Sequence, residues 1–345
     1  MPTQTTLPLP SFFDPARVGE VWRVPYEARA AQALAWAKEH DIPPACTDRL
    51  RVCLLAIDVQ NTFCIPDFEL FVGGRSGIGA VEDNSQLCAF IYQNLSKITE
   101  IIPTLDTHTA HQIFHAHFWV DRTGQNPPPM TLISLEDVQK GQWQVNPAIA
   151  SSLGRDLAEL QDFALHYAHR LSTDGKYPLT IWPYHSMLGG IGHALVSAFE
   201  EACFFHNLAR AQQTRFELKG DNPLTENYSI LRPEVLDGPK GQTIAYKNTA
   251  LIQHLLTFDR IIIAGQAQSH CVAWTIDDLL SEIQATDPAL AQKVYLLEDC
   301  TSPVVVPNVV DFTEQADQCY QRYASAGMHL VKSTDKIADW SSFEL

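Results

Sequence analysis

Short and almost continuous runs of apolar residues recur along the chain, and each run ends in polar residues. Such runs are typical of strands that are buried on both faces of a parallel sheet. Five segments have this form, the third being the weakest: 51–60, 100–108, 214–220, 259–268 and 293–302. Segments with a helical spacing of apolar residues precede or separate them: 27–40, 85–99, 192–211, 249–257 and 271–284. This alternation predicts a three-layer α/β/α fold with a central, mostly parallel sheet.

Residues outside this alternation are expected to form an extension and two insertions, not independent domains. Residues 1–50 combine a Pro-rich start with one helical stretch that a pair of prolines ends, so we interpret them as an N-terminal extension. The main domain is expected to span 51–345. Within it, residues 120–180 contain the run NPPPM and mixed helical pieces, which we interpret as a lid-like insertion. A second insertion is expected at 230–246.

The charge balance of the chain narrows the function classes. The 345 residues carry 24 Lys and Arg against 40 Asp and Glu, which gives a formal charge of −16. An acidic surface repels phosphate backbones and anionic membranes, so we expect neither nucleic acid nor a membrane as a partner. No apolar run has the length of a membrane span, and the first residues lack the pattern of a signal peptide. Eight scattered cysteines without a CxxC pair indicate reduced thiols, and we expect a cytoplasmic protein.

Candidate functional residues, metal ligands among them, lie at the predicted strand ends, where the reactive groups of parallel α/β sheets gather. Asp58 ends the first strand. Asp106 and His108 end the second, where residues two apart point to the same side. A carboxylate beside an imidazole is half of a divalent-metal site, and His185 is a candidate for the third ligand. Each residue also has a purely structural interpretation, as a helix cap, a hydrogen-bonded pair or a buried histidine.

A candidate nucleophile follows the fourth predicted strand. Cys271 comes after GQAQSH and opens a predicted helix. The helix dipole is expected to lower the pKa of a thiol there, and backbone N–H groups at the same place can bind an oxyanion. Lys219 ends the weakest strand. Taken alone, a small buried cysteine at a turn and a surface lysine are the simpler interpretations, unless a base and a cation lie near Cys271.

Five motifs follow one another along the chain: AIDVQNTF (56–63), LDTHTAHQIF (105–114), WPYHSMLGGIG (182–192), KGDNPLTENYS (219–229) and GQAQSHCVAWTIDDL (265–279). In this order they resemble the motifs of the isochorismatase-like cysteine hydrolases and, within them, of the nicotinamidases. The resemblance extends from about residue 51 to about residue 305. It implies the isochorismatase-like hydrolase fold and an amidohydrolase that converts nicotinamide to nicotinate and ammonia through a Cys thioester.

The resemblance implies a catalytic triad of Asp58, Lys219 and Cys271. In this triad Asp58 takes the thiol proton, and Lys219 supplies a positive charge that favours both carboxylate and thiolate. The backbone N–H groups of Ala267 and Cys271 would form an oxyanion hole, and the family has a cis peptide bond that here would precede Ala267. Lys247, in the segment AYKNT, competes for the lysine role but lacks the motif context.

The resemblance also implies a metal site formed by Asp106, His108 and His185. Zn²⁺ is the expected ion, with Fe²⁺ or Mn²⁺ as alternatives, and it would bind the pyridine nitrogen of nicotinamide. The aromatic clamp and the pocket tyrosine of the family correspond to Phe63, Trp182 and Tyr228. The expected partner is therefore a small-molecule amide. Because family members commonly self-associate, a homo-oligomer is also expected.

The sequence departs from the nicotinamidase pattern in several places. At the spacing of a second metal histidine it has Gln112, with His111 one residue early, and Ser186 and Ser269 stand where many relatives have Cys and Asp. The insertion at 120–180 has no counterpart in the short enzymes. Two alternatives therefore stay open. One is a cysteine amidohydrolase or isochorismatase-family hydrolase for another small amide or carbamoyl compound, and the other is a catalytically silent partner on the same fold.

Overall fold

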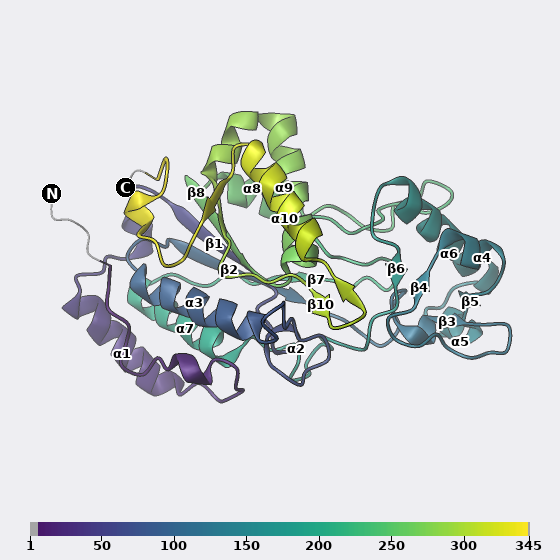
Figure 1. Ribbon diagram of the computed structural model, residues 1–345, viewed down its shortest axis with the longest axis horizontal. Coiled ribbons are helices and arrows are strands. Elements are labelled where there is room, and N and C mark those ends of the chain that lie inside the picture. The colour runs from purple at the N-terminus through teal and green to yellow at the C-terminus, as the bar shows by residue number, and fades with distance from the viewer. Residues whose placement is uncertain (1–5, 344–345) are drawn as a thin grey trace.

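A six-stranded sheet runs through the computed structural model, which describes residues 6–343 (Figure 1). The strand order is β12-β9-β8-β1-β2-β7, and every neighbouring pair is parallel. In chain order the strands are β1 (Val52–Ile57), β2 (Glu100–Asp106), β7 (Glu217–Lys219), β8 (Arg260–Gly265), β9 (Val294–Leu297) and β12 (His329–Val331). The predicted parallel sheet is therefore confirmed.

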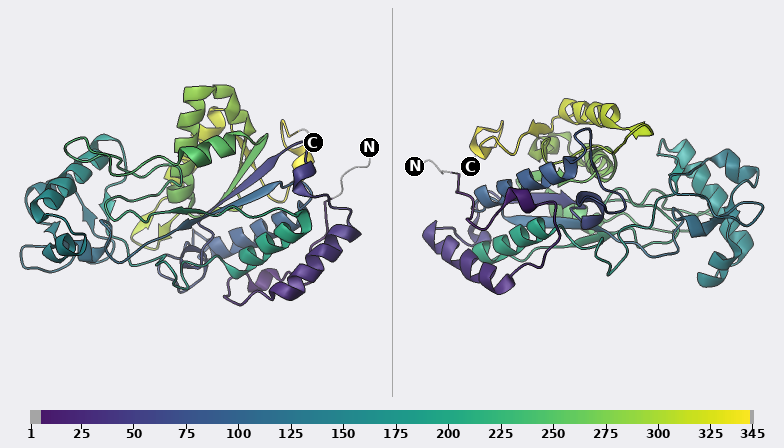
Figure 2. Two further views of the ribbon diagram at one scale, coloured as in Figure 1. Left: turned by 180° about the vertical axis from the view of Figure 1, so that it is seen from behind. Right: turned by 60° about the horizontal axis from the view of Figure 1, so that its bottom comes forward.

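Helices cover both faces of the sheet, because successive side chains of its buried strands point to opposite sides. In β1, Leu54 and Ala56 pack into one hydrophobic core, and Leu55 and Ile57 pack into another. The first face is covered by α3 (Gly79–Gln93) and α7 (Ser197–Arg210), with α1 (Tyr26–Glu39) outside them, and the second by α8 (Thr249–Leu256), α9 (Ala273–Thr286) and α10 (Thr313–Ser325) (Figures 1 and 2). Within residues 6–343, no helix combines the length and the apolar character that a membrane crossing requires.

The segment before β1 is fixed to the outside of α7 by ion pairs. Arg210, at the end of α7, is fully buried, and its guanidinium donates to Oδ1 of Asp48 at 2.6 Å and to the carbonyl of Pro43. On α1, Arg29 donates to Oε1 of Glu201 at 2.8 Å. These contacts attach the N-terminal segment to the body of the α/β fold.

The chain between β2 and α7 forms a small lobe at one end of the molecule (Figure 1). Its elements are β3 (Trp119–Val120), β4 (Leu132–Ile133), α4 (Leu135–Gln139), β5 (Gln144–Val145), α5 (Pro147–Ser152), α6 (Leu157–Thr173) and β6 (Leu179–Thr180). Apolar residues of α6, including Phe163 and Tyr167, pack against Trp119 in a separate core. The base of the lobe adjoins the carboxyl end of β2, where the candidate metal ligands lie.

Two elements near the end of the chain were not predicted from the sequence. In α10 the buried residues are Ala316, Tyr320 and Tyr323, so its apolar face is too narrow to stand out against a polar sequence. Strand β12 has three residues, which is too short to show a period. The helix predicted at 85–99 lies earlier in the structure. It is α3, which begins at Gly79 with a turn of small and acidic residues.

We expect Arg210→Ala to lower the free energy of unfolding by about 3–5 kcal/mol, because the substitution leaves the largely buried carboxylate of Asp48 without its cation. Urea unfolding of the variant and of the wild type measures this difference. Lys140→Ala, which breaks an exposed pair with Glu136, is the control and should leave stability unchanged. A loss for Arg210→Ala no larger than that of the control would contradict this role.

Candidate active site

The carboxyl ends of neighbouring strands bring the three predicted catalytic residues and one predicted metal ligand together. Asp58 follows β1, Asp106 ends β2, Lys219 ends β7, and Cys271 lies in the π-helical turn Gln268–Val272 between β8 and α9. All four side chains are buried. The strand order β8-β1-β2-β7 places these ends side by side, so segments far apart in the sequence meet at one point.

The ammonium group of Lys219 is the centre of this cluster. Its Nζ lies 3.0 Å from Oδ2 of Asp58 and 2.8 Å from Oδ1 of Asp106. It also lies 3.6 Å from Sγ of Cys271 and donates to the carbonyl of Asn227 at 2.9 Å. Burial lowers the pKa of Lys219, but the two carboxylates outweigh burial and hold this pKa well above its usual value. The lysine therefore stays charged.

One carboxylate oxygen of Asp58 is available to accept a proton. Its Oδ1 accepts a hydrogen bond from Oγ1 of Thr104 at 2.5 Å, and its backbone N–H donates to the same hydroxyl at 3.0 Å. Its Oδ2 accepts no hydrogen bond among the described residues, although Lys219 lies beside it. Burial raises the pKa of Asp58, and the charge of Lys219 opposes that rise. When ionised, this carboxylate is therefore a stronger base than a solvated aspartate.

The thiol of Cys271 has a raised pKa, contrary to the prediction from the helix dipole. That prediction was wrong because the residue is 7% exposed, and burial raises the thiol pKa well above its usual value although Lys219 lowers it. The negative charge of Asp58 raises it further. The thiol is therefore protonated at rest, with a carboxylate beside it that can take the proton.

The turn before Cys271 is fixed by the side chain of Gln266. The peptide bond between Gln266 and Ala267 is cis, as predicted. The side chain of Gln266 donates to Oδ2 of Asp83 at 2.8 Å and accepts from the backbone N–H of Ser302 at 3.3 Å. Ala267 lines the same cavity as Cys271, and its N–H donates to no group within residues 6–343. This turn therefore presents an open backbone donor beside the thiol.

Asp106, His108 and His185 offer three metal-donor atoms that all lie within 4.8 Å of one another. In each histidine Nδ1 is engaged by a backbone carbonyl, that of Gly220 at 3.0 Å for His108 and that of Pro183 at 2.8 Å for His185. Both Nε2 atoms therefore face Oδ2 of Asp106, at 2.7 Å and 3.4 Å. Two imidazoles and a carboxylate, oriented by outer hydrogen bonds, fit Zn²⁺, Fe²⁺ or Mn²⁺.

Gln60 holds the backbone of one candidate metal ligand. Its Oε1 accepts from the N–H of Asp106 at 2.7 Å, and its Nε2 donates to the carbonyl of the same residue at 2.9 Å. Nε2 also donates to the carbonyl of His193 at 2.9 Å. Because Gln60 is fully buried, these bonds fix the end of β2 against the segment that follows β1.

Three residues that the sequence offered as alternatives, Lys247, Gln112 and His111, form hydrogen bonds with neither the thiol nor the metal-donor cluster. Lys247 is exposed and pairs with Glu282, so the lysine that reaches the thiol is Lys219. Gln112 donates to backbone carbonyls, and the ring of His111 lies 2.8 Å from Oγ of Ser152. Neither of these two side chains belongs to the three-donor cluster.

Sequence reasoning gave no role to two buried titratable residues at the site. The ring centroid of His115 lies 5.9 Å from that of His108 and 6.1 Å from that of His185, and burial lowers its pKa to about 3. Glu226 lines the cavity, accepts from the N–H of Asn227, and has a pKa that burial raises to about 7. The available signals were the four histidines between 108 and 117 and the KG-to-YS motif.

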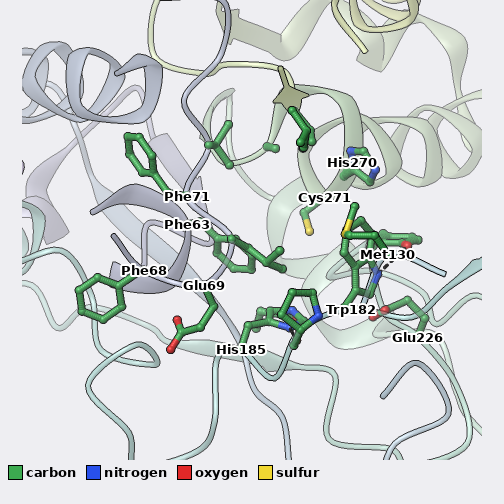
Figure 3. A pocket seen from close by; sticks show the side chains of 18 of the residues that line it. Phe63, Phe68, Glu69, Phe71, Met130, Trp182, His185, Glu226, His270 and Cys271 are labelled. Carbon is green, nitrogen blue, oxygen red and sulfur yellow. Dashed lines mark hydrogen bonds and ion pairs between the residues drawn. The ribbon is translucent and has the colours of Figure 1, made fainter. Parts of the chain in front are cut away.

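A cavity of about 370 Å³ opens onto Cys271 (Figure 3). The three predicted substrate-binding residues, Phe63, Trp182 and Tyr228, all line it. Nε1 of Trp182 donates to the hydroxyl of Tyr228 at 3.2 Å, and Phe63 packs edge-on against His185 with ring centroids 5.7 Å apart. The cavity therefore joins the thiol, the metal-donor set and an aromatic wall.

Neither a protein-family model nor a curated protein matches the chain. Solved structures do share its architecture. The yeast nicotinamidase bound to the inhibitor nicotinaldehyde is 17% identical, with 81% of this chain and 99% of that chain covered and a TM-score of 0.50. An Acinetobacter baumanii nicotinamidase and pyrazinamidase is 17% identical (84% and 99% covered, TM-score 0.49). An N-carbamoylsarcosine amidase from Thermoplasma acidophilum is 12% identical (83% and 99% covered, TM-score 0.41). At 17% identity the likeness to the yeast structure concerns the fold alone, and it supports the three-layer α/β fold with a parallel sheet that the sequence predicts.

We expect the stability of the protein to depend on pH through Asp83. Burial raises the pKa of Asp83 from 3.8 to about 7, so the folded protein holds this proton more tightly than the unfolded chain. The contribution of the protonated group is full below about pH 4 and is lost as the pH rises to about 7. Asp83→Asn cannot ionise and should gain stability relative to the wild type across this range, by up to about 4 kcal/mol.

Urea unfolding between about pH 4 and pH 8 measures this difference in stability for Asp83→Asn. Glu82→Gln, at an exposed position of the same helix, is the matched control. A difference between Asp83→Asn and the wild type that stays constant with pH would refute the buried acid.

Proposed function

We propose that the protein is a cysteine amidohydrolase that converts nicotinamide to nicotinate and ammonia. The observation that carries this proposal is the ammonium of Lys219, within 3.0 Å of a carboxylate oxygen of Asp58 and 3.6 Å of the sulfur of Cys271. The cavity beside it contains a three-donor set suited to a divalent metal. The five motifs and the shared fold of the yeast nicotinamidase, which was solved with nicotinaldehyde, support nicotinamide as the substrate.

The proposed reaction begins with transfer of the thiol proton of Cys271 to Oδ2 of Asp58. The thiolate attacks the amide carbon and forms a C–S bond, while the carbonyl oxygen takes the negative charge. Backbone N–H groups of Ala267 and Cys271 would stabilise that charge. When the carbonyl re-forms, the C–N bond breaks, and the leaving nitrogen takes the proton from Asp58 and departs as ammonia. Throughout, Lys219 stabilises whichever of the thiolate and the carboxylate is charged.

Water then hydrolyses the thioester in the proposed second half. Asp58 takes a proton from the water, and the water oxygen attacks the thioester carbon. The C–S bond breaks, the acid product forms, and the sulfur of Cys271 regains the proton from Asp58. One carboxylate therefore moves a single proton in each half-reaction, which suits a base whose pKa is raised by burial.

Asp106, His108 and His185 would hold the metal in this proposal, with Zn²⁺ expected and Fe²⁺ or Mn²⁺ also compatible with the donors. When bound, the ion supplies a Lewis-acid contact for the pyridine nitrogen of the substrate. The chain itself orients the ring between Phe63 and Trp182. Since Lys219 pairs with Asp106 as well as with the catalytic carboxylate, one cation fixes the metal ligand and the base relative to each other.

A hydrolase of another small amide or carbamoyl compound is the second candidate. A cavity of about 370 Å³ offers more room than one pyridine ring with an amide group requires, and this observation favours a larger substrate. A catalytically silent partner is the weakest alternative, because the acid, the ammonium and the thiol lie together in the cavity.

We expect the protein to release ammonia and nicotinate from nicotinamide, and Cys271→Ala to lower kcat by about 10³-fold or more, because the nucleophile is lost. Ammonia release and chromatography of nicotinate measure the reaction. Cys319→Ala, which removes a thiol outside the catalytic cavity, is the control and should keep the wild-type rate. Ammonia from carbamoyl amides but not from nicotinamide would refute the substrate, and an active Cys271→Ala protein would refute the mechanism.

Asp106→Ala and His108→Ala are expected to lose the bound metal and to raise KM for nicotinamide by about tenfold or more, because each removes a donor from the set. Elemental analysis of the purified proteins measures the metal directly. His111→Ala removes an imidazole that lies outside the set and should keep the wild-type content. Unchanged metal content in Asp106→Ala would rule out the site.

A further inference from the structure

The cavity that opens onto Cys271 extends well beyond the catalytic residues. Its outer end is lined by apolar residues from three separate segments: 68–72, Met130 and 304–306. We propose that this outer end is a subsite for an apolar group of the substrate, so that the enzyme prefers ring carboxamides with an apolar extension over nicotinamide itself. This inference rests on the proposed amidase function and names its substrate class more closely.

The size of the cavity is the first argument. Its volume of about 370 Å³ corresponds to about twelve water molecules at roughly 30 Å³ each. A pyridine ring with one amide group, placed between Phe63 and Trp182 beside the thiol, fills only the inner part. Cavities of this size typically hold ligands larger than a single ring. The outer end is therefore available to a further group on the same substrate.

The chemistry of the outer end is the second argument. Phe68 and Phe71 lie on one side of the opening and Met130 on the other, with Cys271 between them (Figure 3). These apolar side chains are only partly buried, and that of Met130 is 38% exposed. Apolar surface gathered at the mouth of a cavity marks a binding region, because an apolar group that covers it removes it from water.

One wall of the outer end is fixed to the catalytic turn. This wall is a hairpin formed by β10 (Val305–Val306) and β11 (Val310–Asp311). The N–H of Val304 donates to Oγ of Ser269, two residues before Cys271, at 3.0 Å. The hairpin is also linked to the rest of the protein by an ion pair, in which Nε of Arg75 lies 2.8 Å from Oδ2 of Asp311. The subsite is therefore preformed at a set position from the nucleophile, which reduces the cost of binding.

The opposite wall comes from the inserted lobe. The N–H of Met130 donates to the carbonyl of Ile181 at 2.6 Å, which holds this side chain next to Trp182. A methionine adapts to apolar groups of different shape. Glu69, on the same rim as the phenylalanines, accepts from Oγ1 of Thr62 at 3.0 Å, and its charge disfavours an anionic extension. The occupant is therefore expected to be apolar and uncharged.

The test compares nicotinamide with its 4-, 5- and 6-phenyl derivatives. Binding to Cys271→Ala is measured by calorimetry, and kcat/KM of the wild type is measured by ammonia release. We expect at least one derivative to bind about tenfold tighter than nicotinamide and to show a correspondingly higher kcat/KM. Weaker or equal binding of all three derivatives would overturn the subsite.

Two substitutions locate the effect within the Cys271→Ala background. Val305→Asp and Met130→Asp each place a carboxylate in one wall, and each should lower the affinity ratio of the best phenyl derivative to nicotinamide by about tenfold. The matched controls are Val309→Asp on the same hairpin and Leu132→Asp in the same lobe, which lie outside the cavity and are 72% and 59% exposed. Thermal unfolding shows whether each variant folds. If one wall variant does not fold, the variant in the other wall is used for the test. An unchanged ratio in a folded wall variant would overturn the subsite.

Different measurements would refute the subsite and the amidase proposal. If the wild type hydrolyses no carboxamide, the amidase proposal fails, while tighter binding of a phenyl derivative still supports the subsite. If nicotinamide is hydrolysed but no derivative binds more tightly, the subsite is overturned and the amidase proposal stands.

Discussion

One buried ammonium group holds the site together. Lys219 neutralises the carboxylates of Asp58 and Asp106, which the strand ends bring close to each other inside the protein. Without that cation two like charges would share a poorly hydrated site, and one carboxyl would take up a proton. The same ammonium faces the sulfur of Cys271. The charge balance of the candidate catalytic residues and the position of a candidate metal ligand therefore depend on a single side chain.

Burial determines the pKa values of the thiol and the carboxyl at this site. The thiol of Cys271 and the carboxyl of Asp58 both have raised pKa values because burial excludes water from them, so the uncharged thiol is favoured. The cavity beside these two residues has charged side chains at its inner end and mostly apolar side chains at its outer end. The inserted lobe and the hairpin after β9 build this outer end, whereas the sheet builds the inner end. Segments outside the central sheet therefore line the outer end of the cavity.

The sequence predicted best what depends on local pattern. The buried strands β1 and β8 are continuous apolar runs, and the residues at their ends belong to recognisable motifs, so the sheet and the gathering of Asp58 and Cys271 could be anticipated. Properties that depend on packing between distant segments could not be anticipated from the sequence. The pKa of the thiol was predicted in the wrong direction because its burial is a tertiary property. Met130 and Val305 carry no motif, and only the folded chain brings them to one opening.

The strand that carries Lys219 lies at the edge of the sheet. It has three residues, pairs only with β2 within residues 6–343, and leaves Phe216 and Leu218 exposed beside it. Short edge elements open locally at a smaller free-energy cost than the rest of a domain, and this applies to β7 as it does to the equally short β12 at the opposite edge. Fraying would withdraw the cation while the central strands remain paired. The cation on which the site depends is therefore carried by a margin of the sheet and not by its centre.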